Sequence, residues 1–143
     1  MMSEADIKKS IDLYNEGLIY AKKNDFKSAE ELYLQAIELN SEFFQAHYNL
    51  GNIYKNSGKL NKAIKFYQKS IEIKSDFINA YYNLGNTLKM LAKLDDAEKN
   101  FNKVLELNPN LGEAKENLQI ISELKELKSI VKPIKNNKKI ITN

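Results

Sequence analysis

The sequence has no cysteine, no arginine, one histidine and two prolines. Without cysteine the chain has no disulfide, no thiolate metal site and no thiol nucleophile. Because all of its basic side chains are lysines, it also lacks the bidentate pair that arginine forms with a carboxylate. It contains no long apolar run, and charges occur within a few residues of the amino terminus. We therefore expect no membrane-spanning helix, no secretion and a cytoplasmic location.

Motifs that carry catalysis are missing as well. Glycine-rich phosphate loops and zinc-ligand spacings are absent, and His47 has no partner in a repeated motif that would make a nucleophile–base pair. Three pairs of carboxylates fit helix starts and solvated faces better than a metal site: Glu30 with Glu31, Asp95 with Asp96, and Glu113 with Glu116. We expect no enzyme activity, no metal and no cofactor.

What the chain does contain is a 34-residue unit, present three times at about 10–43, 44–77 and 78–111. Each unit has two amphipathic stretches separated by a turn cluster, such as the one at Gly58. A glycine within a helix costs about 1 kcal/mol relative to alanine. A glycine that recurs at the same position of every unit therefore predicts a close contact between the first helix and its partner helix. The recurring glycines are Gly17, Gly51 and Gly85, and the small residues that recur on the partner helix are Ala29, Ala63 and Ala97. A helix pair of this kind must stack on neighbours to bury its apolar face.

The unit resembles the tetratricopeptide repeat, in which W-x-x-L-G-x-x-Y is followed by A-x-x-x-F and then proline. The residues that carry the resemblance are His47, Leu50, Gly51, Tyr54, Ala63 and Tyr67 in the second unit and Tyr81, Leu84, Gly85, Leu88, Ala97, Phe101 and Pro109 in the third. His47 occupies an aromatic packing position. The first unit departs at Glu16, where leucine is usual. The resemblance covers about 70% of the chain and implies an all-α, right-handed solenoid of three helix pairs that acts by protein–protein interaction.

The two ends of the chain differ from the repeats. Ser3 and Asp6 predict a capping box that opens the first helix. An apolar stripe that includes Leu118 and Leu127 predicts a capping helix at about 112–131, which completes a domain of residues 1–131 and ends at Pro133. Residues 132–143 hold four lysines and no acid, and without them the formal charge falls from +3 to −1. We expect a solvated, disordered tail; contact with a membrane surface or nucleic acid, or a junction with a further part, stay open.

In the tetratricopeptide family the first helices of successive repeats line a concave groove. Helical phase places four columns of polar side chains opposite the packing faces, and these are the candidate peptide-binding residues. The columns are Asn15, Asn49, Asn83 and Asn117; Tyr14, Tyr48 and Tyr82; Asn52 and Asn86; and Lys22, Lys55 and Lys89.

The asparagine column is the sharpest of these features. An amide side chain offers a donor and an acceptor together, as a peptide backbone does. Neighbouring helices lie about 8–10 Å apart and an extended peptide rises about 3.3 Å per residue, so one asparagine serves about three peptide residues. The column resembles the asparagine-lined arrays of protein O-GlcNAc transferases, which hold extended polypeptide. We expect these amides to face solvent in the empty groove; the alternative is that they bond between helices and serve stability.

Other partners fit less well. Tetratricopeptide domains that grip the acidic tails of heat-shock chaperones use a clamp of Lys, Asn and Arg, and here Asn49 agrees but Asn79 and Asn83 stand where cations are needed, as does Tyr14. A nucleic-acid partner is disfavoured because the lysine column faces acidic residues of the capping helix: Glu113, Glu116 and Glu123. We predict a scaffold that binds an extended peptide or partner segment. The alternative is a substrate-recruiting or accessory part of a larger enzyme such as a glycosyltransferase; the oligomeric state stays open.

Overall fold

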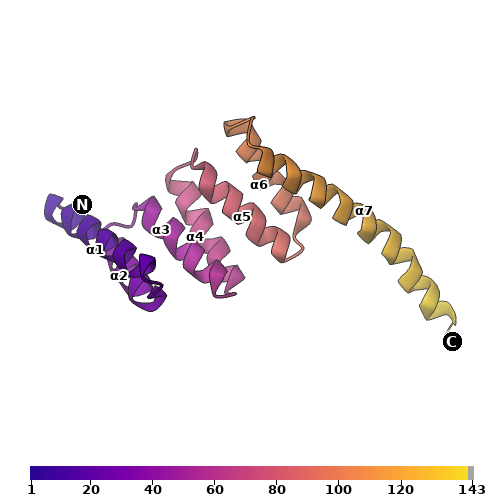
Figure 1. Ribbon diagram of the computed structural model, residues 1–143, viewed down its shortest axis with the longest axis horizontal. Coiled ribbons are helices and arrows are strands. Elements are labelled where there is room, and N and C mark those ends of the chain that lie inside the picture. Colours follow the sequence, from indigo (N-terminus) through magenta and orange to yellow (C-terminus); the bar gives the residue numbers. More distant parts are fainter. Residues whose placement is uncertain (142–143) are drawn as a thin grey trace.

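The computed structural model describes the backbone of residues 1–141 and the side chains of residues 1–132. Regular structure in this part of the chain is helical throughout: α1 (Glu4–Lys22), α2 (Phe26–Leu39), α3 (Phe44–Asn56), α4 (Leu60–Ile73), α5 (Ile78–Met90), α6 (Leu94–Leu107) and α7 (Gly112–Ile141). The helices pack as successive pairs, α1 with α2, α3 with α4 and α5 with α6, which follow one another along the long axis (Figure 1). The predicted all-α solenoid of three helix pairs is confirmed.

Helix starts and turns follow from local chemistry. The predicted capping box is present: Ser3 Oγ accepts a hydrogen bond from the Asp6 N–H at 3.1 Å, and the Asp6 carboxylate accepts one from the Ser3 N–H at 3.2 Å. The turn inside each helix pair contains one residue with positive φ: 60° at Asn24, 77° at Gly58 and 55° at Ala92. The 34-residue period therefore extends to the backbone conformation of the turns.

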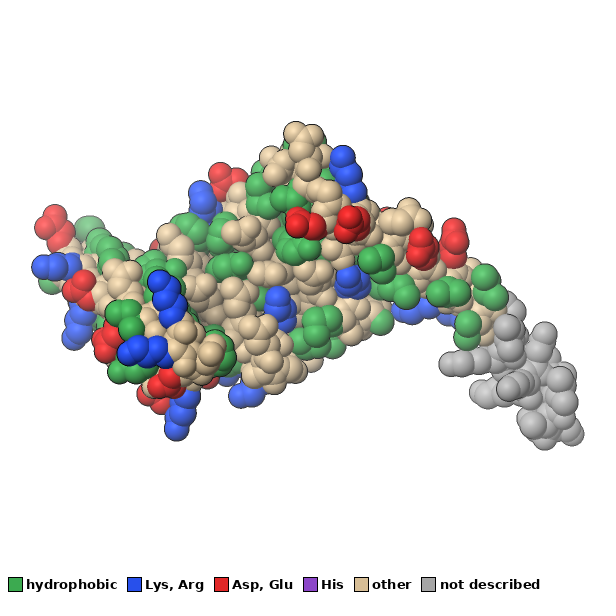
Figure 2. Space-filling view, viewed as in Figure 1, with side chains coloured by type: hydrophobic (Ala, Val, Ile, Leu, Met, Phe, Trp, Pro, Cys, Tyr) green, Lys and Arg blue, Asp and Glu red, His purple; other side chains and the backbone are tan. Residues whose placement is uncertain are grey.

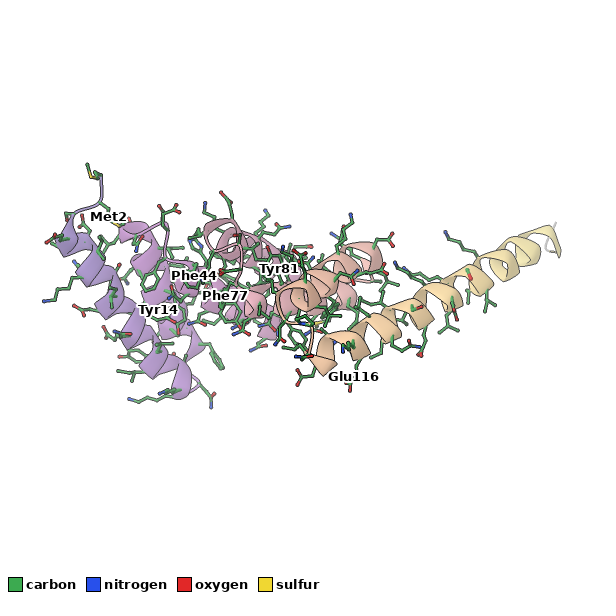
Figure 3. The ribbon with its side chains drawn as sticks, turned by 90° about the horizontal axis from the view of Figure 1, so that it is seen from above. Met2, Tyr14, Phe44, Phe77, Tyr81 and Glu116 are labelled. Carbon is green, nitrogen blue, oxygen red and sulfur yellow. The ribbon has the colours of Figure 1, made fainter. Side chains whose placement is uncertain are left out.

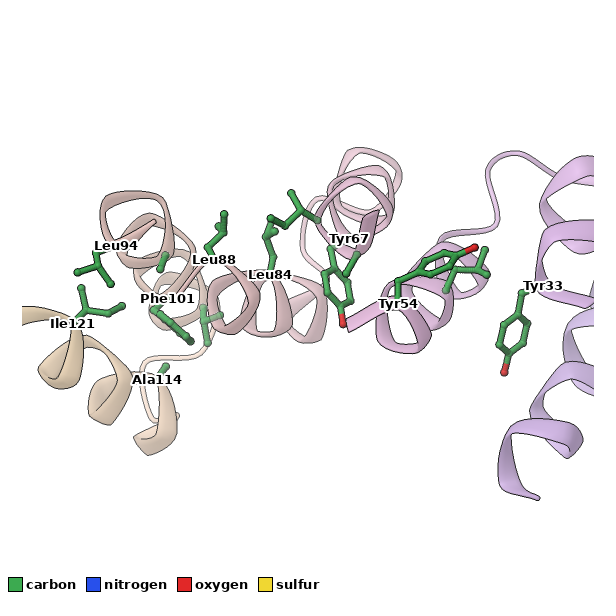
Figure 4. Packing of buried hydrophobic residues seen from close by; sticks show 14 of the residues in the cluster. Tyr33, Tyr54, Tyr67, Leu84, Leu88, Leu94, Phe101, Ala114 and Ile121 are labelled. Carbon is green, nitrogen blue, oxygen red and sulfur yellow. The ribbon is translucent and has the colours of Figure 1, made fainter. Parts of the chain in front are cut away.

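The recurring glycine lies against an aromatic ring of the second helix in its pair. A Cβ added to Gly51 would lie 2.6 Å from the ring of Tyr67, and the same holds at 2.6 Å for Gly17 with Tyr33 and at 3.0 Å for Gly85 with Phe101. Figure 4 shows these three rings along the line of repeats. The predicted close contact is confirmed, and the atoms nearest each glycine are those of the ring rather than of the recurring alanine.

Helix α7 has two parts with different surroundings, a first part up to Lys125 and a second part that follows it. In the first part Ala114 and Ile121 are fully buried and pack against α6, and the Lys125 ammonium forms ion pairs with Asp95, at 2.8 Å, and with Glu98. The second part extends away from the helix pairs (Figure 1). The apolar side chains described in this second part, up to Val131, are exposed to solvent, with Leu127 57% and Ile130 60% exposed, and hydrophobic surface follows this part of the helix in Figure 2. Only the first part of α7 caps the array.

The prediction that Pro133 ends the last helix is wrong, because α7 continues to Ile141. A proline within a helix removes one hydrogen bond to the carbonyl four residues earlier. That carbonyl belongs to Ser129, which is exposed, so water can take the place of the missing N–H. The predicted tail of 132–143 thus begins inside a helix, while residues 142–143 and the side chains of 133–141 lie outside the described part.

Candidate functional site

The four predicted columns lie on the first helices of the successive pairs, α1, α3 and α5, and on α7. The structure brings the asparagine and tyrosine columns together, because each asparagine from the second helix pair onward donates to the tyrosine of the preceding unit. The donor–acceptor distances are 3.1 Å from Asn49 Nδ2 to Tyr14 Oη, 2.8 Å from Asn83 Nδ2 to Tyr48 Oη, and 3.5 Å from Asn117 Nδ2 to Tyr82 Oη. These bonds form a ladder along the first helices of the units, with one bond for each junction between units.

Two lysines of the fourth column each donate to the asparagine of the following unit, across the second and third junctions. Lys55 Nζ donates to Oδ1 of Asn83 at 3.3 Å, and Lys89 Nζ donates to Oδ1 of Asn117. Burial lowers the pKa of Lys55. Lys22, which is one position out of phase with the other two, is exposed and makes no side-chain hydrogen bond to the residues that the structure describes.

The third column contributes at one junction. Asn52 Oδ1 accepts a hydrogen bond from the Tyr67 hydroxyl at 2.7 Å and another from Asn83 Nδ2 at 3.1 Å. One unit later the residue equivalent to Tyr67 is Phe101, which has no hydroxyl. The side chain of Asn86 accordingly forms no hydrogen bond within the described residues.

The expectation that the asparagines face open solvent is wrong for three of the four. Asn49 and Asn83 are half-buried, and Asn117 is 8% exposed. Stacking of the units covers these amides and brings a tyrosine hydroxyl within their reach, and buried polar groups take such partners. Asn15 has no preceding helix pair and is exposed. The role of the column in holding a peptide stays a prediction.

The sequence interpretation missed an aromatic row at the junctions. The ring centroid of Tyr14 lies 4.7 Å from that of Phe43, and the centroid of Tyr48 lies 4.9 Å from that of Phe77. Figure 3 shows the ends of this row, Tyr14 on α1 and Phe77 before α5. Aromatic contacts of this kind fix the tyrosines in place beside the asparagines. The 34-residue step from Phe43 to Phe77 was the available signal.

His47 has the packing role that its position predicts. It is buried, and its Nε2 lies 2.9 Å from the carbonyl oxygen of Ser41 in the loop before α3. Burial lowers its pKa. Tyr81, the equivalent residue one unit later, donates to the carbonyl of Ser75 at 3.0 Å. The two side chains make the same contact with equivalent loops, which identifies the histidine as part of the scaffold.

Among the described side chains, no group of three or more His, Asp or Glu residues is placed to hold a metal ion. No helix in the described part of the chain is both long and apolar enough to cross a membrane.

Solved structures with similar folds are tetratricopeptide domains. The first TPR of Spaghetti (RPAP3), bound to the HSP90 peptide SRMEEVD, has a TM-score of 0.80 and 25% identity, and the match covers 84% of this chain and 95% of that one. The first TPR domain of human RPAP3 has a TM-score of 0.77 and 25% identity over 85% and 95% of the two chains. The Arabidopsis OM64 TPR domain has a TM-score of 0.77 and 20% identity over 82% and 98%. No curated protein sequence matches this chain significantly.

Family models agree with these structures. A model of the TPR repeat matches residues 17–58 and 51–91, and a model of the tetratricopeptide repeat matches residues 78–111. Together the matched residues include all three glycine–aromatic contacts, and they also include Asn49 and Asn83. This chain belongs to the tetratricopeptide repeat family.

Proposed function

We propose that this chain is a protein-interaction scaffold that binds an extended segment of a partner protein along α1, α3, α5 and the start of α7. The observation that carries the proposal is the regular row of asparagine and tyrosine side chains, which recur at a 34-residue step. A regular row of donors and acceptors matches the regular backbone of an extended peptide. The similar domain that is bound to an HSP90 peptide supports a peptide partner.

Asn49 is the member of the row best prepared for a peptide. Its Nδ2 donates to Tyr14, but its Oδ1 accepts no hydrogen bond from the described residues. The reason is that Ala21 occupies the position where the next unit has Lys55. A peptide N–H can therefore donate to Asn49 directly, whereas at Asn83 it must first displace a lysine.

The residues here favour a different peptide from the acidic chaperone tail. The chain has no arginine, and Tyr14, Asn79 and Asn83 stand where the chaperone-binding clamp needs cations. Charge-assisted pairs with a terminal carboxylate are correspondingly fewer. We expect recognition to come from backbone hydrogen bonds and from the tyrosine rings, with Lys22, Lys55 and Lys89 along one side.

A displayed library of random dodecapeptides, selected on the whole chain, tests the proposal. We expect binders with a Kd on the order of micromolar, since each backbone hydrogen bond contributes about 0.5–1.5 kcal/mol and ordering a flexible peptide opposes them. Asn49→Ala should weaken a selected peptide about tenfold, measured by calorimetry. Asn102→Ala, at an exposed asparagine on α6, is the matched control. Selection of no binder, or equal affinity for both variants, would contradict the proposal.

A further inference from the structure

The junction between the first and second helix pairs is not chemically equivalent to the junction that follows it. At the following junction Asn52 accepts two hydrogen bonds, one at 2.7 Å from the Tyr67 hydroxyl of its own helix pair and one at 3.1 Å from Asn83 across the junction. In the first helix pair the residues equivalent to Tyr67 and Asn52 are Tyr33 and Leu18, and a leucine side chain cannot accept a hydrogen bond. The Tyr33 hydroxyl hydrogen therefore has no acceptor among the residues that the structure describes, although the residue is only 1% exposed.

A second polar atom at this junction, Oδ1 of Asn49, also accepts no hydrogen bond from the described residues. The amide of Asn49 lies beside the Tyr33 hydroxyl, and its Nδ2 donates to Tyr14 at 3.1 Å. Its Oδ1 receives no hydrogen bond within the described part of the chain, because Ala21 stands in place of a lysine. The first junction thus presents one unused donor and one unused acceptor that lie close together.

These two groups border a hollow of about 310 Å³ between α1, α2 and α3. Its apolar walls come from Leu18, Ala21, Phe26 and Ile53, and its other polar lining residues are Lys22, Asn52 and Asn56. Burial raises the pKa of Tyr33 to about 12, so the hydroxyl keeps its proton and remains a donor at neutral pH. The hollow combines an apolar passage with a donor and an acceptor.

Building on the proposed function, we infer that this hollow is a side-chain pocket for the bound segment and that it takes a glutamine-type side chain, an apolar stem that ends in a carboxamide. The stem lies against Leu18, Ala21 and Ile53. The carboxamide oxygen accepts the Tyr33 hydroxyl, and the carboxamide N–H donates to Asn49 Oδ1. A primary amide is the terminal group that supplies both partners at once.

Other side chains match less well. A leucine or norleucine side chain fills the apolar part and leaves the Tyr33 hydroxyl and Asn49 Oδ1 unpaired in a site from which it has displaced water. A glutamate presents only acceptors, so its carboxylate meets Asn49 Oδ1 oxygen to oxygen and loses hydration. We expect the carboxamide to be preferred over norleucine by about tenfold or more.

The pocket can be tested without a partner protein. N-acetyl-glutamine methylamide is titrated into the ¹⁵N-labelled chain, and N-acetyl-norleucine methylamide is titrated in parallel. We expect the glutamine derivative to shift the amide resonances of Leu18, Tyr33, Asn49 and Ile53, with the norleucine derivative at least about tenfold weaker. Absence of these shifts up to the solubility limit, or equal binding of the two probes, overturns the proposal.

Three variants sharpen the test. Leu18→Asn gives the first junction the acceptor of the second and should abolish the shifts, while a thermal melt shows that the chain stays folded. Tyr33→Phe keeps the ring against Gly17 and removes the hydroxyl, so the preference for glutamine over norleucine should disappear. Asn86→Leu, at the equivalent position of the third junction, is the control and should leave the titration unchanged. Retained glutamine preference in Tyr33→Phe would contradict the assignment.

The same experiments separate this inference from the proposed function. If the glutamine derivative binds in the hollow and the displayed dodecapeptides do not bind the groove, the groove proposal fails and the pocket stands. If selected peptides bind but show no glutamine preference and are unaffected by Leu18→Asn, the pocket fails and the groove stands.

Discussion

The interior of each helix pair and the junctions between pairs are built by different rules. Inside the pairs the same contact recurs three times, a glycine against an aromatic ring, as in Gly51 with Tyr67. At the junctions the bond from asparagine to tyrosine also recurs, but other equivalent positions hold different residues, such as Leu18 where the next unit has Asn52. Two helix backbones that approach closely leave few solutions, whereas side chains across a junction can be exchanged. The chemical differences between the units of this array therefore lie mainly at the junctions between pairs.

Removal of α7 should have the largest effect on stability, because it deletes the whole junction between the third helix pair and α7. A chain ending at Asn110 exposes side chains of α6 that are buried, including Phe101 and Val104, and terminal units need a polar outer face. We expect aggregation or loss of cooperative unfolding, measured by size-exclusion chromatography and urea denaturation. A chain ending at Lys132 is the control and should keep the urea midpoint. A soluble shorter chain with unchanged stability would show that α7 is no cap.

Gly51→Leu tests the interior of a pair. The added side chain begins 2.6 Å from the Tyr67 ring, so either the ring or the helix must move. Overpacking of this kind costs about 1–3 kcal/mol or more, which chemical denaturation measures. Gly112→Ala is the control, because a Cβ there meets no atom within 4 Å. Equal denaturation midpoints for the two variants would show that the contact with the Tyr67 ring does not prevent a larger side chain at position 51.

Asn83→Ala tests a junction. The side chain donates to Tyr48 and Asn52 and accepts from Lys55, and each such bond contributes about 0.5–1.5 kcal/mol. We expect the free energy of unfolding to fall by about 1–2 kcal/mol. Asn15→Ala, at an exposed asparagine without a preceding unit, should change little. If both variants unfold at the wild-type midpoint, the ladder does not stabilise the array.

His47 gives the junction loops a pH dependence. Its pKa is lowered in the folded chain, chiefly by burial, so at low pH the unfolded state binds the proton more readily. Stability should therefore decline as pH falls below about 6.5 and level off once the pH is below the folded-state pKa. His47→Tyr copies Tyr81 of the next unit and should remove this decline. Urea midpoints of both chains at several pH values test this prediction. If His47→Tyr shows the same decline as the wild type, the decline comes from carboxylates and not from His47.

The smallest effect concerns the turn inside the third pair. Ala92 has a φ of 55°, where a residue with a Cβ is disfavoured by about 1–2 kcal/mol, while glycine loses more chain entropy on folding. Ala92→Gly should raise the free energy of unfolding by about 0.5 kcal/mol. Gly58→Ala, the reverse change one unit earlier at φ 77°, should lower it. Thermal melts measure both changes. If the two variants shift the melting temperature in the same direction, the positive φ does not determine stability at these turns.

Much of the fold was predictable because the 34-residue period carries it. Helix pairs, the capping box at Ser3 and the close contact at Gly51 follow from local spacing alone. Asn110, with Glu113 three residues later, has the spacing of a further capping box, but this cap does not form: α7 begins at Gly112, and the Asn110 N–H donates to the Asn108 side chain at 3.2 Å. Two asparagines precede that helix start, and local preference does not choose between them.

The candidate site was predictable only as columns of residues. Helical phase correctly placed Asn83 and Tyr48 on the first helices, but it says nothing about how one helix pair sits on the next. The hydrogen bond between them depends on that placement. The hollow at Leu18 could not be predicted for a related reason. A leucine at a position where the next unit has asparagine means little until the structure shows that the Tyr33 hydroxyl beside it has no acceptor.

The hydrogen bonds between successive units make the central unit a module. Asn83 bonds with Tyr48 and Lys55 of the unit before it, and residues 44–77 also contain Asn49, the equivalent of Asn83. In an in-frame duplicate of these 34 residues, Asn49 of the second copy would find Tyr48 and Lys55 of the first copy at the same positions, whereas an insertion of another length would shift these pairs out of register. Such an array can lengthen by gene duplication one whole unit at a time, and each unit would extend the groove by about three peptide residues.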